Sequence, residues 1–179
     1  MSVWINFKNS FKNLTNTRSL VFGALFIALN VILTRFLSFE NQFVRFSLGF
    51  LPVALYSMMF GAIPGAFAAA IGDLVGVFLF SKGAFFPGFT LSAFISGILY
   101  GLFLYKRKVT VLNVTLVTLI ITLLIDLYLN TVWLTMLTGK AAAAFLGLRI
   151  VKIAIMFPIQ VFLIYEMDKQ VLQKLKIKV

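Results

Sequence analysis

The sequence contains no cysteine and no histidine. Without cysteine there is no disulfide bond, no thiolate metal site and no thiol catalysis. Without histidine the chain lacks the usual proton shuttle, the commonest metal ligand and every histidine-based nucleophilic triad. The Gly-x-x-x-x-Gly-Lys-Ser/Thr phosphate loop is also missing, so this chain does not hydrolyse ATP by that device. These absences argue against an enzyme, and we expect no catalytic residue, no metal and no cofactor.

Acidic residues are scarce as well. Five Asp and Glu stand against 16 Lys and Arg, which gives a formal net charge of +11. Apolar side chains, in contrast, make up 61% of the 179 residues and occur in runs long enough to cross a bilayer. In such a chain an excess of basic charge sets the orientation and contacts anionic lipid, so we expect a lipid bilayer and no nucleic acid as partner. The composition predicts an integral membrane protein.

Six apolar stretches predict an all-α membrane protein with six transmembrane helices. We expect Pro64 and Gly65 to break the chain between the second and third stretches. The fifth, at about 29 residues, has to tilt or to extend beyond the hydrocarbon. The chain then divides into an amphipathic N-terminal segment (1–17), a six-helix transmembrane domain (18–168) and a basic tail (169–179). The six stretches are residues 19–38, 46–62, 65–81, 87–105, 109–137 and 146–167.

Basic residues cluster before the first stretch, after the fourth and after the sixth. With six spans the three clusters fall on one side of the membrane, and the positive-inside rule makes that side cytoplasmic. Both termini are therefore expected in the cytoplasm, whereas the connections at 38–46, 79–94 and 137–146 face outward. The clusters are Lys8, Lys12 and Arg18, then Lys106, Arg107 and Lys108, and finally Lys169, Lys174, Lys176 and Lys178.

Apolar residues also recur before the first stretch. Trp4, Phe7, Phe11 and Leu14 are spaced by three or four residues and form one helix face suited to the membrane surface. The alternative is a frayed tail.

Several cations lie outside these clusters, on the outward side. A lumen rimmed by cations attracts an anion, while the alternative is headgroup contact by snorkelling side chains. Arg149 and Lys152 are three residues apart, so they share a helix face and could hold carboxylates. The alternative for this pair is an ion pair with an acid of this chain. The cations outside the clusters are Arg35, Arg45, Lys82, Lys140, Arg149 and Lys152.

Polar residues also interrupt two of the apolar stretches. Asp126, Asn130 and Trp133 are spaced i, i+4 and i+7 and form one stripe. A carboxylate within the bilayer has to face protein or a cavity. Asp126 and Asn130 could therefore hydrogen-bond an amino-heterocycle on which Trp133 stacks. The alternative is a buried packing network. For Asp73, in the third stretch, we expect a hydrogen bond to a neighbouring helix.

The outward connection LFSKGAFFPGFTLSAF (79–94) gathers aromatic rings beside a proline and a glycine. Phe86 and Phe89 could enclose a flat ligand. Gly88 would let main-chain N–H groups approach the ligand near a helix N-terminus, where the dipole favours anions. Thr90 completes this candidate wall.

Small residues at four-residue spacing allow helices to approach closely in lipid. Three pairs have this spacing, and they either pack the bundle or form a face for a partner protein. The pairs are Ala24 and Ala28, Gly72 and Gly76, and Gly97 and Gly101.

Four segments together resemble the folate-specific S component of energy-coupling factor (ECF) vitamin transporters. They are RFSLGFLPVAL (45–55), GAIPGAFAAAIGDLVG (61–76), FFPGFTLSAFISGILYG (85–101) and LRIVKIAIMFPIQ (148–160).

The resemblance implies a multi-pass protein of a prokaryotic cell membrane. It also implies an outward site for folate or a close derivative, a transmembrane T subunit and two cytosolic ATPases as partners, and reorientation in the membrane. Ala24 and Ala28 match the family's motif for docking on the T subunit. The site would comprise Arg45, Phe86, Gly88, Phe89, Thr90, Asp126, Asn130, Trp133, Arg149 and Lys152.

Other functions stay open at this point. An S component for another flat vitamin, such as riboflavin, differs only in its substrate. A membrane subunit that assembles a complex without transporting would also carry small-residue faces. A channel or proton-driven carrier is the third alternative, weakened by the lack of histidine.

Overall fold

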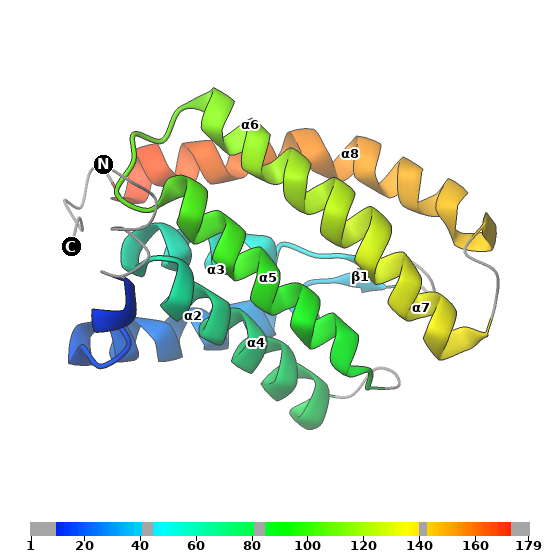
Figure 1. Ribbon diagram of the computed structural model, residues 1–179, viewed down its shortest axis with the longest axis horizontal. Coiled ribbons are helices and arrows are strands. Elements are labelled where there is room, and N and C mark those ends of the chain that lie inside the picture. The colour runs from blue at the N-terminus through cyan, green and yellow to red at the C-terminus, as the bar shows by residue number, and fades with distance from the viewer. Residues whose placement is uncertain (1–9, 41–44, 81–84, 140–142, 173–179) are drawn as a thin grey trace.

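The computed structural model describes residues 10–40, 45–80, 85–139 and 143–172. Most of these residues are helical, and the helices lie side by side as a bundle (Figure 1). The helices are α2 (Thr17–Arg35), α3 (Phe50–Phe60), α4 (Ala62–Leu79), α5 (Pro87–Leu104), α6 (Val111–Ile120), η1 (Ile121–Leu129), α7 (Asn130–Thr138), α8 (Ala143–Met167) and η2 (Asp168–Leu172), where η denotes a π-helix.

Each of the six predicted apolar stretches contains a helix, which confirms the all-α fold class. Within the described residues, five helical runs are long and apolar enough to cross a membrane, and α3 is a shorter apolar helix of 11 residues. The fifth run continues through α6, η1 and α7 for 28 residues. The long runs are Thr17–Arg35, Ala62–Leu79, Pro87–Leu104, Val111–Thr138 and Leu146–Gln170.

The second stretch forms a shorter helix than predicted. Its 11 residues rise about 16 Å, roughly half of the hydrocarbon thickness. The predicted start at residue 46 lies instead in strand β2 (Arg45–Phe46), which pairs antiparallel with β1 (Phe39–Glu40). Ser47 Oγ then accepts a hydrogen bond from Gly49 N–H at 3.3 Å, and this turn stops the apolar run from continuing as helix. Non-helical chain therefore precedes α3 where the sequence predicted a membrane span.

The break between α3 and α4 also differs from the prediction. It lies at Gly61, whose φ is 100°, a conformation that glycine adopts without steric cost. Pro64 and Gly65 lie within the first turn of α4 instead. Proline is tolerated there because its missing N–H would have no partner inside the helix. Ser10 Oγ accepts a hydrogen bond from Ile63 N–H at 2.9 Å and so caps the start of α4.

Two of the three small-residue pairs pack the bundle internally. A Cβ added at Gly101 would lie 2.3 Å from Ala62 Cα, because α5 lies directly against α4. A Cβ at Gly97 would lie 2.5 Å from the Gly65 carbonyl oxygen, and one at Gly76 would lie 2.8 Å from Arg35 Nε. The third pair, Ala24 and Ala28, is exposed on α2.

The apolar core lies toward one end of the bundle, which we call the basic end. This is the end where α2 begins and where Lys106, Arg107 and Lys108 connect α5 to α6 (Figure 1). The second half of α3, the end of α5, the start of α6 and the last turns of α8 meet there. The strand pair lies toward the opposite end. The buried core comprises Ala54, Leu55, Tyr56, Met58, Met59, Phe60, Tyr100, Leu104, Val114, Val117, Ile121, Ile125 and Ile164.

Candidate ligand-binding site

The centre of the fifth span is widened into the π-helix η1. Turns of π-helix are uncommon and occur frequently at functional sites. Asp126 lies within η1, and Asn130 is the first residue of α7. The predicted polar stripe therefore falls where the helix changes from one geometry to the other.

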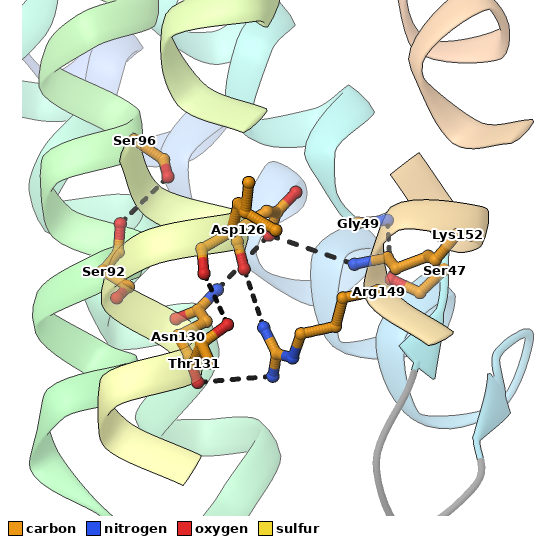
Figure 2. A network of polar contacts seen from close by, with 10 residues as sticks. Ser47, Gly49, Ser92, Ser96, Asp126, Asn130, Thr131, Arg149 and Lys152 are labelled. Atoms are coloured by element: carbon orange, nitrogen blue, oxygen red, sulfur yellow. Dashed lines mark hydrogen bonds and ion pairs between the residues drawn. The ribbon is translucent and has the colours of Figure 1, made fainter. Parts of the chain in front are cut away.

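Asp126 is the centre of a polar network between the fifth span and α8 (Figure 2). Asn130 Nδ2 donates to Asp126 Oδ1 at 3.3 Å. Lys152 Nζ, from α8, lies 3.9 Å from the same oxygen. The side chains of Lys152 and Asp126 remain 19% and 25% exposed, so this pair is accessible. The sequence analysis gave an ion pair within the chain as the alternative to ligand binding for Arg149 and Lys152. Lys152 forms such a pair with Asp126.

Arg149 contacts the main chain of the fifth span (Figure 2). Its Nη1 donates to the carbonyl oxygen of Asp126 at 2.7 Å, and its Nη2 donates to that of Asn130 at 3.3 Å. Two polar atoms here are buried without a hydrogen-bond partner in the described part of the chain, Arg149 Nε and Asn130 Oδ1. A donor and an acceptor are thus left unsatisfied beside the network, and buried polar groups of this kind are uncommon outside functional sites.

The charges of this network do not cancel. Arg149 and Lys152 contribute two positive charges and Asp126 one negative charge, which leaves an excess of one positive charge at pH 7. An uncompensated charge at membrane depth is costly, because little water is available to solvate it. A ligand with a carboxylate would neutralise the excess.

Aromatic side chains form a wall beside the polar network. The ring centroids of Phe86 and Trp133 are 5.8 Å apart, and those of Phe86 and Phe89 are 6.1 Å apart. Trp133 Nε1 donates to Ser92 Oγ on α5 at 3.1 Å, which fixes the indole between α7 and α5. Ser92 is a site residue that the sequence analysis missed, because an isolated serine in an apolar helix carries no distinctive signal.

Gly88 and Thr90 support this wall from the first turn of α5. A Cβ at Gly88 would lie 2.5 Å from Trp133 Cδ2, so the missing side chain makes room for the indole. Thr90 Oγ1 donates to Asp73 Oδ2 at 2.7 Å and thereby joins α5 to α4. The expected hydrogen bond between Asp73 and a neighbouring helix is present, with Asp73 as the acceptor.

Other predicted residues are only partly described. The main chain of Arg45 lies in β2, where its Cα is paired with that of Glu40, but its side chain lies outside the described part. Lys82, Lys140, Trp4 and Phe7 also lie outside the described residues. Among the residues that are described, no three His, Asp or Glu side chains gather as a possible metal site.

The fold defines a multi-pass membrane protein, and its fifth span and α8 carry a polar network between them. A family profile described as "ECF-type riboflavin transporter, S component" matches residues 14–169. The chain therefore belongs to the S components of ECF-type transporters, a family of transporter subunits and not of enzymes.

Individual relatives support the assignment to this family. The chain is 46% identical over 152 residues to the folate transporter FolT of Clostridium novyi, covering 85% of this chain and 88% of the relative. It is 33% identical over 156 residues to FolT of Leuconostoc mesenteroides, covering 84% of each chain. A crystal structure of FolT bound with folic acid matches with a TM-score of 0.83 and 38% identity, over 87% of this chain and 95% of that one. The resemblance noted from four sequence segments is confirmed.

Proposed function

We propose that the protein is the folate-binding S component of an ATP-driven vitamin importer. It captures folate or a close derivative at an outward-facing site in the cell membrane of a prokaryote. Its similarity to FolT proteins supports this assignment, above all the match to the structure that holds folic acid.

The observation that carries the proposal is the pairing of an aromatic wall with excess positive charge. Folate combines a flat pterin, an aromatic linker and a glutamate with two carboxylates. Phe86, Phe89 and Trp133 offer ring faces for the flat parts. Asp126 and the unpaired Asn130 Oδ1 offer acceptors to the donor-rich pterin edge. The excess positive charge of the network suits the carboxylates.

Riboflavin is the second candidate ligand, since the family profile carries that name. Riboflavin is also flat and would stack on the same rings, but it has no carboxylate. It would leave the excess charge of the Asp126 network unneutralised, and folate is therefore the better match. Thiamine is a cation and suits the site least.

The membrane orientation proposed from the basic clusters also indicates where the partner subunits would bind. The basic end is assigned to the cytoplasm and the strand pair to the outside. Ala24 and Ala28 would form the docking face for a T subunit, which in turn binds two cytosolic ATPases. Their exposure on α2 supports this role, because side chains that packed the bundle would be covered. Reorientation of the docked S component would carry folate inward.

A ligand panel tests the substrate. Folate, riboflavin and thiamine are titrated into the purified chain in detergent, with Trp fluorescence and thermal unfolding as readouts. Replacing Trp4 by Phe leaves Trp133 as the only indole, because the chain has two Trp. We expect folate to quench Trp133 and to raise the unfolding temperature, and thiamine to do neither. Tight riboflavin binding without folate binding would move the assignment to the second candidate. No binding of either vitamin would contradict the proposal.

A further inference from the structure

Two cations reach the fifth span from α8, and the structure gives them different partners. Arg149 donates its two terminal nitrogens to the carbonyl oxygens of Asp126 and Asn130, at 2.7 and 3.3 Å. These carbonyls lie four residues apart, across the junction of η1 and α7. A guanidinium bridges two such acceptors because its donors are held in a flat fork, which an ammonium lacks.

Arg149 therefore acts as a clasp on the main chain of the fifth span. Loss of these two charge-assisted hydrogen bonds would weaken the connection between α8 and the fifth span. Each terminal nitrogen has two N–H groups, and one of each is taken up by a carbonyl oxygen. Only its buried Nε remains without a partner among the described residues. Arg149 is thus already bound to the protein on two of its three nitrogens, and its third nitrogen is buried.

Lys152 differs from Arg149, because its one contact within the described residues is the ion pair with Asp126. Its Nζ lies 3.9 Å from Asp126 Oδ1, beyond normal hydrogen-bond length, and that oxygen already accepts a hydrogen bond from Asn130. An ammonium has three donors, and within the described residues this one makes only the long contact to Asp126. The side chain is also partly exposed, so a ligand can reach it.

Building on the proposed function, we infer that Lys152 and Arg149 have different roles in ligand binding. Lys152 is the specificity-determining residue that recognises a carboxylate of the ligand. Arg149 is a positioning residue that holds the η1–α7 junction, and with it Asp126 and Asn130, in the shape that binds the heterocycle. The sequence had assigned carboxylate binding to both residues alike.

The test compares folate with its diamide, in which both glutamate carboxylates are converted to amides of nearly the same shape. Dissociation constants for both ligands are measured on the full chain by Trp133 fluorescence. Lys152→Met should weaken folate about ten-fold or more and leave the diamide unchanged, so that the preference for folate disappears. Lys152→Arg should keep that preference. Arg149→Lys, which retains the charge, should weaken both ligands by the same factor.

Thermal unfolding identifies variants that fail to fold, and Lys152→Gln serves as a second neutral variant at that position. The inference is overturned if Arg149→Lys removes the preference for folate while Lys152→Met leaves it intact. It is equally overturned if Lys152→Met weakens both ligands alike, or if no variant changes their ratio. A wild-type chain that binds folate no better than its diamide also overturns it, whereas a wild-type chain that binds neither ligand contradicts the proposed function itself.

Discussion

The indole nitrogen of Trp133 donates a hydrogen bond to Ser92 Oγ at 3.1 Å, and this bond joins the fifth span to α5. Both partners lie far apart in the sequence, and the serine is buried. The indole is therefore held at its polar atom, while its ring remains beside Phe86. A ring fixed in this way stacks on a ligand with little loss of side-chain entropy.

Removing the hydroxyl should loosen the indole. Ser92→Ala leaves the indole N–H without its partner, and we expect folate binding to weaken by about 0.5–1.5 kcal/mol, the usual range for one hydrogen bond. Folate titration by Trp133 fluorescence measures the change. The matched control is Ser96→Ala, one turn along α5, whose hydroxyl donates only to the Ser92 carbonyl oxygen. Equal effects of the two substitutions would remove Ser92 from this role.

A methyl group at Gly88 should displace the same ring. The added Cβ would meet Trp133 Cδ2 at 2.5 Å, so the indole has to move away from α5. We expect Gly88→Ala to weaken folate about ten-fold, or about 1.4 kcal/mol, and to shift Trp133 emission. Gly147→Ala is the control, because a Cβ there meets nothing within 4 Å. Unchanged emission and affinity in Gly88→Ala would show that the ring tolerates the methyl group.

A substitution at Gly101 tests helix packing separately from folate binding. Its Cβ would lie 2.3 Å from main-chain atoms of Ala62, and main chain gives way less easily than a side chain. We expect Gly101→Ala to destabilise the fold by about 1–3 kcal/mol, as overpacked cores do. Thermal unfolding in detergent measures this loss. At a temperature where the variant is folded, its folate affinity should match that of the wild type. A stable Gly101→Ala variant would mean that α4 and α5 can separate without cost.

Substitutions at the exposed alanines of α2 test whether this face docks on a T subunit. Bulky side chains at Ala24 or Ala28 should keep a T subunit from close approach without disturbing the distant site. We expect Ala24→Trp and Ala28→Trp to leave folate binding by the isolated chain within about 0.5 kcal/mol of wild type. ATP-driven folate uptake by the assembled complex should be abolished. Leu112→Trp, on the exposed face of α6, is the control and should transport normally. Parallel loss of binding and uptake would mean that the alanines support the fold.

Residue spacing was enough to predict part of the site. Asp126 and Asn130, four residues apart, do share a face and a hydrogen bond. Arg149 and Lys152, three apart, do approach that face from α8. Periodicity works here because each pair lies on one continuous helical run, where residues three or four apart are neighbours.

Other features depend on contacts that spacing does not report. The π-helical widening around Asp126 has no signature in residue type, and the partners of Arg149 are main-chain oxygens, which every residue possesses. The break before α4 was placed at Pro64 because proline is the stronger signal, yet the backbone turns at Gly61. Hydropathy overestimated α3 because Phe46 and Leu48, which precede the helix, extend the apolar run across the turn before Phe50.

The buried core described at the basic end leaves the molecule closed on that side. Tyr56, Phe60, Tyr100, Leu104 and Ile164 fill the space between helices there, below the level of the Asp126 network. The Asp126 network is therefore separated from the basic end by packed apolar side chains. Under the proposed function, folate bound at this network could not pass along the bundle through that packing. Its release on the other side of the membrane would require the helices to move as one body.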